Sequence, residues 1–202
     1  MLCVKQIVNT PVSSNCFVVY DLNISNNCLI IDPGTEKCNE LLFYLEKEQL
    51  IPVYILLTHE HFDHIWGVEK LREKYDCKVI SSFNCSSLIT DPKKNLSLFY
   101  DQKGFRCSPA DMIIEDLSNP MNFQSYDIYF YNTPGHSSGS ICIKIKNYLF
   151  TGDTLMENMK TPTKLPGGDQ LLLQLSLDFI VCNFPKDTII FPGHGNSFLL
   201  KQ

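Results

Sequence analysis

The chain has little of what marks a membrane, secreted or disulfide-stabilised protein. No stretch approaches the roughly 20 apolar residues that cross a bilayer, and the first residues lack the basic start and apolar run of a signal peptide. The nine cysteines are an odd number and form no Cys-x-x-Cys pair, which favours reduced thiols. We therefore expect a cytoplasmic protein in which Cys16, Cys28 and Cys142 are small core residues.

Basic residues are also few, with 17 Lys and Arg against 22 Asp and Glu and a formal net charge of -5. Because nucleic acids select basic surfaces, this balance argues against a nucleic-acid partner. It is compatible with a small anionic substrate beside metal ions, which bring positive charge of their own. The expected partner is thus a small-molecule substrate, without nucleic acid or membrane, and the sequence makes no prediction of oligomeric state.

Short apolar runs alternate with helical patterns over the 202 residues, which is typical of a mixed α/β domain. Strands are predicted at residues 17–20, 29–31, 53–57, 78–80, 128–131, 141–145, 148–150 and 188–191. Helices are predicted around residues 41–45, from about 63 to 75 and around 171–179, the first with Thr35 as its N-cap. Two hairpins end in Asp32 and Asp153, which hints at two similar halves.

Residues 91–125 are rich in Pro, Asn, Asp and Ser, and this composition predicts an irregular loop over the site. Its aromatic residues Phe99, Tyr100 and Phe105 either gate the site or cover apolar surface. Of these two roles, we favour the second, that the aromatic residues cover apolar surface.

Histidine is scarce, yet all five histidines fall in three short motifs that follow predicted strands. The motifs are Thr58-His59-Glu60-His61-Phe62-Asp63-His64, Pro134-Gly135-His136 and Pro192-Gly193-His194-Gly195, with Gly152-Asp153-Thr154 between the last two. A single histidine after a strand is more often a hydrogen-bonded structural residue than a ligand. A core cannot readily use three histidines and an aspartate within six positions, so together the motifs predict a site for two metal ions.

The spacing within the first motif divides its donors between two adjacent ions. His59 and His61 are two apart, so in an extended segment both rings point the same way, while Asp63 and His64 begin the next helix. The candidates that complete the two ions or bridge them are His136, His194 and Asp153. Imidazole and carboxylate ligands without a thiolate suit zinc, iron or manganese.

Neighbouring residues are expected to support the ligands. Asp32 is a candidate for holding a ligand imidazole in one tautomer, although an aspartate before proline also initiates turns. Thr58 and Thr154 are candidates for bonding ligand carboxylates, whereas Trp66 and Met156 are expected to be packing residues. The glycines expected to permit tight turns near the ligands are Gly135, Gly139, Gly152 and Gly193.

In this order the motifs resemble those of the metallo-β-lactamase superfamily, and most closely those of small glyoxalase II-like hydrolases. Looser markers of the resemblance are Asn15-Cys16-Phe17, Asp32-Pro33-Gly34, Asn95-Leu96-Ser97 and Leu165-Pro166-Gly167-Gly168-Asp169. The resemblance implies an α/β fold, an αββα sandwich of two mixed sheets flanked by helices, as a single domain over residues 1–202. It assigns one ion to His59, His61 and His136 and the other to Asp63, His64 and His194, with Asp153 bridging them.

The chain also departs from these families. Most metallo-β-lactamases place a cysteine at the position of Asp153, which disfavours hydrolysis of antibiotics. Thr161-Pro162 stands where glyoxalase II relatives carry a Gly-Arg or Gly-Lys pair that contacts the substrate, and Lys164 where an aspartate is common. Proline brings neither a cation nor a backbone donor. Because the chain ends at Gln202, we expect no C-terminal helical domain of the kind that binds glutathione in full-length glyoxalase II.

The expected function is dinuclear metal-dependent hydrolysis of a small thioester, in which a metal-bound hydroxide attacks a carbonyl. Two divalent ions, zinc with iron or manganese as alternatives, would act with Asp63 and Asp153 as catalytic carboxylates. The first alternative is a persulfide dioxygenase-like enzyme with a single iron on His59, His136 and Asp153. The further alternatives are a lactonase or phosphodiesterase and a non-catalytic metal-binding module.

Overall fold

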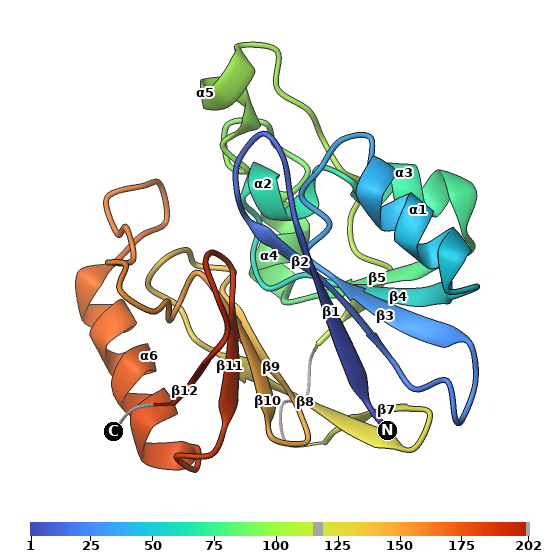
Figure 1. Cartoon of the computed structure of the whole chain (residues 1–202). Coiled ribbons are helices and arrows are strands. Elements are labelled where there is room, and N and C mark those ends of the chain that lie inside the picture. Colours follow the sequence, from blue (N-terminus) through green and yellow to red (C-terminus); the bar gives the residue numbers. More distant parts are fainter. Residues whose placement is uncertain (115–118, 201–202) are drawn as a thin grey trace.

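The computed structural model describes residues 1–114 and 119–200, in which two six-stranded sheets pack face to face between helices (Figure 1). The first sheet has the order β1-β2-β3-β4-β5-β6 and the second the order β12-β11-β10-β9-β8-β7. The strands of the first sheet are β1 (Cys3–Val8), β2 (Asn15–Tyr20), β3 (Asn27–Ile31), β4 (Ile51–Leu56), β5 (Lys78–Ser81) and β6 (Met112–Ile113). Those of the second are β7 (Met121–Phe123), β8 (Tyr126–Asn132), β9 (Ile141–Ile145), β10 (Tyr148–Gly152), β11 (Ile189–Pro192) and β12 (Phe198–Leu199).

The described part of the chain has six helices. They are α1 (Asn39–Lys47), α2 (Phe62–Ile65), α3 (Val68–Lys74), α4 (Phe83–Leu88), α5 (Ser97–Asp101) and α6 (Gln170–Asn183). In Figure 1, α1 and α3 lie beside the first sheet, and α6 lies along the second. None of these helices, in the part of the chain that the structure describes, is long and apolar enough to cross a membrane.

Alternating side chains of the strands separate three apolar layers. In β2, Phe17 and Val19 join the layer between the sheets, whereas Cys16 and Val18 face the layer under α1 and α3. On the far side, Ile180 of α6 packs with residues of β9, β10 and β11. Strands that are buried on both faces have continuous apolar runs, which is why sequence predicted them well. The predicted αββα sandwich is therefore confirmed, and Cys16, Cys28 and Cys142 are core residues.

Each sheet repeats one topology, which confirms the two similar halves. In the first half, β1, β2 and β3 are antiparallel neighbours, and β4 joins parallel to β3 after α1. In the second half, β8, β9 and β10 are antiparallel neighbours, and β11 joins parallel to β10 after α6. Strands β3 and β4 share one direction, and β8, β10 and β11 share another, so the loops that follow them gather at one edge of each sheet. The backbone N–H of Ile141 donates to the carbonyl of Thr58 at 2.8 Å, and this bond joins the two edges.

Several local predictions were wrong. Helix α1 is capped by Cys38, which has a left-handed φ of 51°, and not by Thr35, whose hydroxyl accepts instead from the backbone N–H of Thr10 at 2.9 Å. The single helix predicted over 63–75 is divided into α2 and α3 at Gly67. A Cβ on Gly67 would lie 2.2 Å from the sulfur of Cys38, so the close approach of these segments requires glycine. Strand β1 and helix α4 were not predicted.

The segment predicted as a loop over residues 91–125 contains α5, β6 and β7, and its residues 115–118 lie outside the described part of the chain. Tyr100 stacks on Phe62 with ring centroids 4.8 Å apart, and Phe105 stacks on Trp66 at 5.3 Å. Phe99 is exposed. Two of the three aromatic residues therefore cover apolar side chains in and next to α2, which agrees with the interpretation as cover.

Candidate metal centre

The loop of residues 58–64 follows β4 and carries four of the seven predicted ligands. Asp32, which follows β3, holds the start of this loop: its Oδ1 accepts from the backbone N–H of Thr58 at 2.8 Å and its Oδ2 from the Thr58 hydroxyl at 2.5 Å. His61 is still extended, with φ -65° and ψ 144°, whereas Asp63 and His64 lie in α2. The backbone thus changes direction between the first two ligands of the loop and the last two, as the spacing predicts.

Glycines allow the remaining ligand loops to approach one another. Gly135 and Gly152 have φ angles of 134° and 49°, a backbone region that other residues rarely adopt. Gly139 and Gly193 permit close contact instead: a Cβ on Gly193 would lie 2.1 Å from Oδ1 of Asp153. The predicted role of these four glycines therefore has two distinct physical causes.

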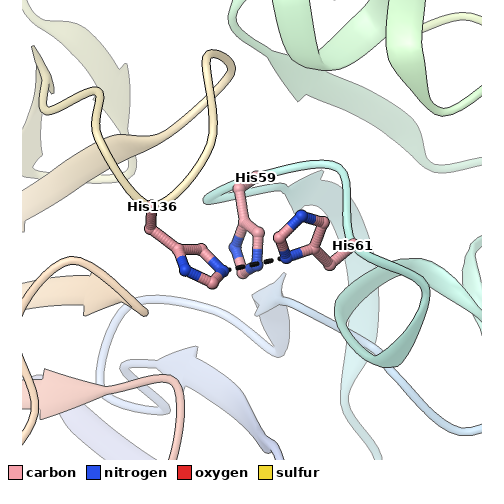
Figure 2. A group of neighbouring side chains, drawn as sticks. All are labelled: His59, His61 and His136. Carbon is pink, nitrogen blue, oxygen red and sulfur yellow. Dashed lines mark hydrogen bonds between the residues drawn. The ribbon is translucent and has the colours of Figure 1, made fainter. Parts of the chain in front are cut away.

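The predicted ligands meet at the edges of the two sheets and form two groups. The ligand atoms within each group lie within 4.8 Å of one another, and the groups are His59, His61 and His136 on one side and Asp63, His64 and His194 on the other. Figure 2 shows the first group, in which Nδ1 of His61 faces Nε2 of His136 at 2.8 Å with the ring of His59 beside them. Each group combines residues from both halves of the chain.

Asp153 lies between the two groups. Its Oδ2 is 3.5 Å from Nε2 of His136 in the first group and 3.5 Å from Nε2 of His194 in the second. Its Oδ1 is 3.5 Å from Nε2 of His64. In the second group, Oδ2 of Asp63 lies 3.4 Å from Nε2 of His194. The Asp153 carboxylate therefore faces both groups, as a bridging ligand must.

Several donor atoms of this cluster are buried without a partner. Among the described residues, Nε2 of His59, Nε2 of His64 and Oδ1 of Asp153 are buried at the centre and have no hydrogen-bond partner. Leaving a buried polar atom unpaired costs about 1–3 kcal/mol, a cost that coordination of a metal would offset. Five imidazoles and two carboxylates, with no thiolate, are a donor set for zinc, iron or manganese. The residues therefore fit a pair of divalent metal ions.

The first half of the chain orients two of the imidazoles. Nδ1 of His64 lies 3.0 Å from Oδ2 of Asp32, and Nδ1 of His59 lies 3.1 Å from the hydroxyl of Thr58. A hydrogen bond on one ring nitrogen fixes the tautomer and aims the other nitrogen at the metal position. The predicted contact of Asp32 with a candidate ligand imidazole is present, whereas the carboxylate that Thr58 bonds is that of Asp32 and not that of a predicted ligand.

Two further imidazoles bond to backbone carbonyls. Nδ1 of His136 lies 2.9 Å from the carbonyl oxygen of Pro162, and Nδ1 of His194 lies 3.0 Å from that of Ser13. The hydroxyl of Thr161 donates to the carbonyl oxygen of Asp153 at 2.9 Å. The segment Thr161-Pro162 therefore supports two candidate ligands, His136 and Asp153. This is its role in the chain, although it lacks the Lys or Arg that glyoxalase II relatives carry at this position.

In the first group, burial favours neutral imidazoles. Burial lowers the pKa of His61 to about 3, and it lowers the pKa values of His59 and His136 as well. Repulsion from neighbouring imidazoles acts in the same direction. Neutral imidazole is the form that binds a metal ion, so this group is ready to coordinate without losing protons.

In the second group, the carboxylates overcome burial. Burial alone would lower the pKa of His64, but Asp63 and Asp153 raise it to about 9. The same two carboxylates raise the pKa of His194 to about 10, again against burial. Burial raises the pKa of Asp153, but the charge of His64 and the hydrogen bond of His194 lower it overall. Without metal, the two carboxylates therefore favour the protonated form of both imidazoles in this group.

Some supporting residues were wrongly assigned from the sequence or missed. Thr154 does not bond a ligand carboxylate; its hydroxyl lies 3.3 Å from the carbonyl oxygen of Thr133. Asn15 donates to the carbonyl oxygens of Pro192 at 2.9 Å and Gly195 at 2.8 Å, on either side of His194. In the sequence, the only signal for this contact is a polar amide at the start of the apolar run 16–19.

Met156 and Trp66 are packing residues, as expected, whereas the sequence did not indicate that Glu60 is buried. Met156 is buried, and Trp66 contacts Phe62 and Phe105 through their rings. Glu60 is 1% exposed although it was given no role. Burial raises the pKa of its carboxyl, and hydrogen bonds to the carboxylate oppose that rise. A charged residue between two ligands was the signal that could have found it.

Comparison with known proteins agrees with this geometry. The chain matches the family model of the metallo-beta-lactamase superfamily over residues 9–194. A probable metallo-hydrolase of Bacillus subtilis, YqgX, is 34% identical over 189 residues, which are 92% of this chain and 86% of that protein. A hydroxyacylglutathione hydrolase of Buchnera aphidicola is 29% identical over 189 residues, which are 94% of this chain and 66% of that protein.

Solved structures include similar folds. The crystal structure of the BLEG-1 B3 metallo-beta-lactamase has a TM-score of 0.90 at 32% identity, and the match covers 98% of this chain and 94% of that one. The structure of TTHA1623 in a di-iron-bound form has a TM-score of 0.79 at 28% identity, and the match covers 97% and 94% of the two chains. The family match over most of the chain, together with these similarities, shows that the chain belongs to the metallo-beta-lactamase superfamily.

Proposed function

We propose that this chain is a dinuclear metal-dependent hydrolase of small thioesters, similar to glyoxalase II. The observation that carries the proposal is the position of Asp153, whose carboxylate faces two buried groups of ligands at once. A complete second group around His194 favours two ions over the single iron of a persulfide dioxygenase-like enzyme. The similarity to a hydroxyacylglutathione hydrolase supports a thioester as the substrate.

In this proposal the chain supplies orientation and a proton acceptor. A pair of divalent ions, when bound, lowers the pKa of water from about 15.7 to about 7 and polarises a carbonyl. Asp153 holds the two ligand groups at a fixed separation, and the hydroxyl of Thr161 fixes the backbone of Asp153. In this proposal Asp63 would also accept the proton of the attacking water, although it is buried and the charge of His64 lowers the pKa of its carboxyl, so it is a weak base.

The metals that we propose are zinc ions, with iron as the first alternative. Imidazole and carboxylate ligands bind both, and the similar TTHA1623 structure is a di-iron form. Elemental analysis of protein purified without added metal, followed by reconstitution with zinc or iron, decides between them. Hydrolysis of a thioester by the zinc-loaded protein supports the proposal. Oxygen uptake with a persulfide substrate, by protein that holds one iron per chain, supports the dioxygenase.

In the proposal, the segment after β10 forms the substrate side of the site. A cavity of about 350 Å³ is lined by residues 160–164 together with Gln170, and its lining includes Pro162, which bonds His136. Lys160 and Lys164 are exposed, and both line this cavity. In the proposal these ammonium groups favour a thioester whose acyl or thiol part carries a carboxylate, so an anionic thioester should be hydrolysed faster than a neutral one of the same size.

The test is a hydrolysis panel on protein of known metal content. It contains glutathione thioesters, coenzyme A thioesters, lactones and phosphodiesters, and it includes a β-lactam because the BLEG-1 structure is similar. We expect the highest kcat/KM on a thioester. A preference for the β-lactam, the lactone or the phosphodiester would replace the proposed substrate, and no turnover by fully loaded protein would favour a non-catalytic module.

The role of Asp153 has its own test. Asp153→Ala removes the carboxylate between the two groups, so paired metal occupancy and nearly all turnover should be lost. Elemental analysis of the variant gives the occupancy, and thioester assays give the turnover. An active variant with two ions per chain would contradict the mechanism.

A further inference from the structure

A buried carboxylate that the mechanism does not use lies between the two ligand loops of the first group. Glu60 stands between His59 and His61 and is 1% exposed. Its Oε2 accepts a hydrogen bond from the hydroxyl of Ser137 at 2.9 Å, and Ser137 directly follows His136. This bond therefore connects the residue between two ligands of the group to the residue next to the third.

The turn after His136 is built around this carboxylate. The hydroxyls of Ser137 and Ser140 are 2.8 Å apart, and the backbone N–H of Ser137 donates to the Ser140 hydroxyl at 3.3 Å. A Cβ on Gly139 would lie 2.4 Å from Oε2 of Glu60, so only glycine allows the backbone to come this close to the carboxylate. The turn and the carboxylate are thus in direct contact along residues 137–140.

A third element fixes the outer side of the same turn. The hydroxyl of Ser82, the N-cap of α4, donates to the carbonyl oxygen of Gly139 at 2.8 Å. The side-chain amide of Asn84 donates to the carbonyl oxygen of Ser138 at 3.0 Å. The turn is therefore held between α4 and Glu60, and Glu60 is the contact on the side of the ligands.

The second group of ligands is held by different residues. His64 is oriented by Asp32 and His194 by the carbonyl of Ser13. The Ser14 hydroxyl bonds the backbone carbonyl of Asp63 at 2.5 Å. None of these contacts involves Glu60 or residues 137–140. Asp32 serves both groups, because it also holds Thr58 beside His59, whereas the contacts of Glu60 with residues 137–140 reach only the first group.

We propose that Glu60 is a positioning residue that sets the spacing of His59 and His61 against His136, and so controls metal affinity at the first position alone. The inference rests on the proposed dinuclear site. Glu60 does not coordinate a metal in this scheme; it acts through Ser137 on the loop of His136. The carboxylate accepts from the hydroxyl of Ser137 and from the backbone of Gly139, and glutamine keeps one acceptor oxygen whereas alanine keeps none, which separates the effects of two substitutions.

The experiment is a cobalt titration of metal-free protein followed by visible absorption, which reports the coordination at each position. Reference spectra come from His136→Ala, which leaves the second group intact, and His194→Ala, which leaves the first. For Glu60→Ala we expect affinity at the first position to fall by about 10- to 100-fold, and the remaining spectrum to match that of His136→Ala. Glu60→Gln keeps an acceptor for Ser137 and should stay within a few-fold of the unsubstituted protein.

Ser137→Ala removes the partner hydroxyl, and it should weaken the first position as Glu60→Ala does, with no further loss in the double variant. Ser138→Ala is the matched control, because this neighbouring side chain is exposed and its hydroxyl makes no hydrogen bond with the described residues. Equal weakening of both positions by Glu60→Ala, unchanged cobalt binding, or a Glu60→Gln variant as weak as Glu60→Ala overturns the inference. If Glu60→Ala does not fold, Ser137→Ala decides: binding of two ions with unchanged affinity overturns it.

The titration needs no substrate, so the inference and the proposed function fail in different ways. If the unsubstituted protein binds two cobalt ions and the variants do likewise, only the role of Glu60 is wrong. If the unsubstituted protein binds no pair of ions, the proposed dinuclear site fails and the inference fails with it.

Discussion

Nδ1 of His64 lies 3.0 Å from Oδ2 of Asp32, although the two residues follow different strands of the first sheet. The same carboxylate also accepts from the backbone and the hydroxyl of Thr58, so it joins the end of β3 to both ends of the ligand loop after β4. Because the position of an imidazole decides how well it binds a metal, the contact makes Asp32 a determinant of the second metal position.

Replacement of this carboxylate by an amide tests that role. In Asp32→Asn, one of the acceptor oxygens becomes an NH₂ group that cannot accept from Thr58 or His64. We expect metal affinity at the second position to fall by roughly 10- to 100-fold. Zinc titration against a competing chelator measures it. Asp187→Asn, an exposed aspartate at the end of β11 opposite His194, is the control, and equal affinities in the two variants would contradict the prediction.

Replacement of Asn15 by aspartate keeps the shape of the side chain but replaces a hydrogen-bond donor with an acceptor. Its amide donates to two carbonyl oxygens beside His194, and its side chain is 1% exposed. In Asn15→Asp a carboxylate would face those carbonyls, so we expect a loss of about 3 kcal/mol or more in the free energy of unfolding, and weaker binding at the second metal position. Asn15→Ala should cost less, because it leaves no buried charge.

Chemical denaturation of metal-free protein measures the first effect. Asn183→Asp is a matched control, since the exposed Asn183 amide donates to the carbonyl of Phe179 on the surface. This control should lose under about 1 kcal/mol. An Asn15→Asp variant as stable as the control would show that the contact contributes little.

The layer between the sheets predicts a large difference between two phenylalanines. Phe17 is 2% exposed, and its ring lies edge-on to Phe150 at 5.3 Å and to Phe191 at 5.4 Å. Phe17→Ala should therefore cost about 3–5 kcal/mol, because it leaves a cavity between the sheets. Phe99 is 70% exposed, and Phe99→Ala should change stability by less than about 0.5 kcal/mol. Urea denaturation measures both values, and similar losses would argue against this packing.

The second ligand group gives metal-free protein a distinctive dependence on pH. The pKa values of His64 and His194 are raised from 6.5 to about 9 and about 10. A group with a higher pKa in the folded chain stabilises the fold fully below its unfolded pKa, and loses that contribution as the pH rises through the folded value. We therefore expect the Tm of metal-free protein to fall from pH 6.5 to pH 10.

Calorimetry in the presence of a chelator checks this trend. His194→Gln should reduce the fall, because one of the two raised groups is gone. Zinc-loaded protein should show little of it, since coordinated imidazoles are neutral at every pH in this range. A Tm that rises over the same range would contradict the assignment of charge to the second group.

The parts of the fold that the sequence predicted are those set by burial and by local spacing. Runs such as residues 29–31 and 141–145 are buried on both faces, and that burial leaves an unmistakable apolar pattern. Strand β1 was missed because its exposed and buried residues alternate along an edge of the sheet, with charge and amide groups such as Lys5 and Gln6. The N-cap of α1 was misplaced because Cys38 takes a left-handed conformation that its residue type does not favour.

The residues of the site also differ in how well the sequence predicted them. The spacing of the loop 58–64 was enough to indicate which residues gather, and the structure brings all seven of the predicted ligands together. Supports that come from distant backbone carbonyls, such as those of Ser13 and Pro162, leave no mark on residue type. Thr154 was misassigned for a related reason: a hydroxyl beside a ligand has several possible acceptors, and only the fold decides among them.

Each ligand group takes residues from both halves of the chain, and this has a consequence for folding. His61 and His136 are 75 positions apart, so an ion held by both would act as a cross-link between the sheets. The site cannot exist in either half alone, and metal would therefore bind only after the halves have docked. By mass action, metal at 1,000 times its Kd would add about 4.1 kcal/mol to that docked state. Metal supply would then govern how much of the protein survives in the cell, besides how fast it works.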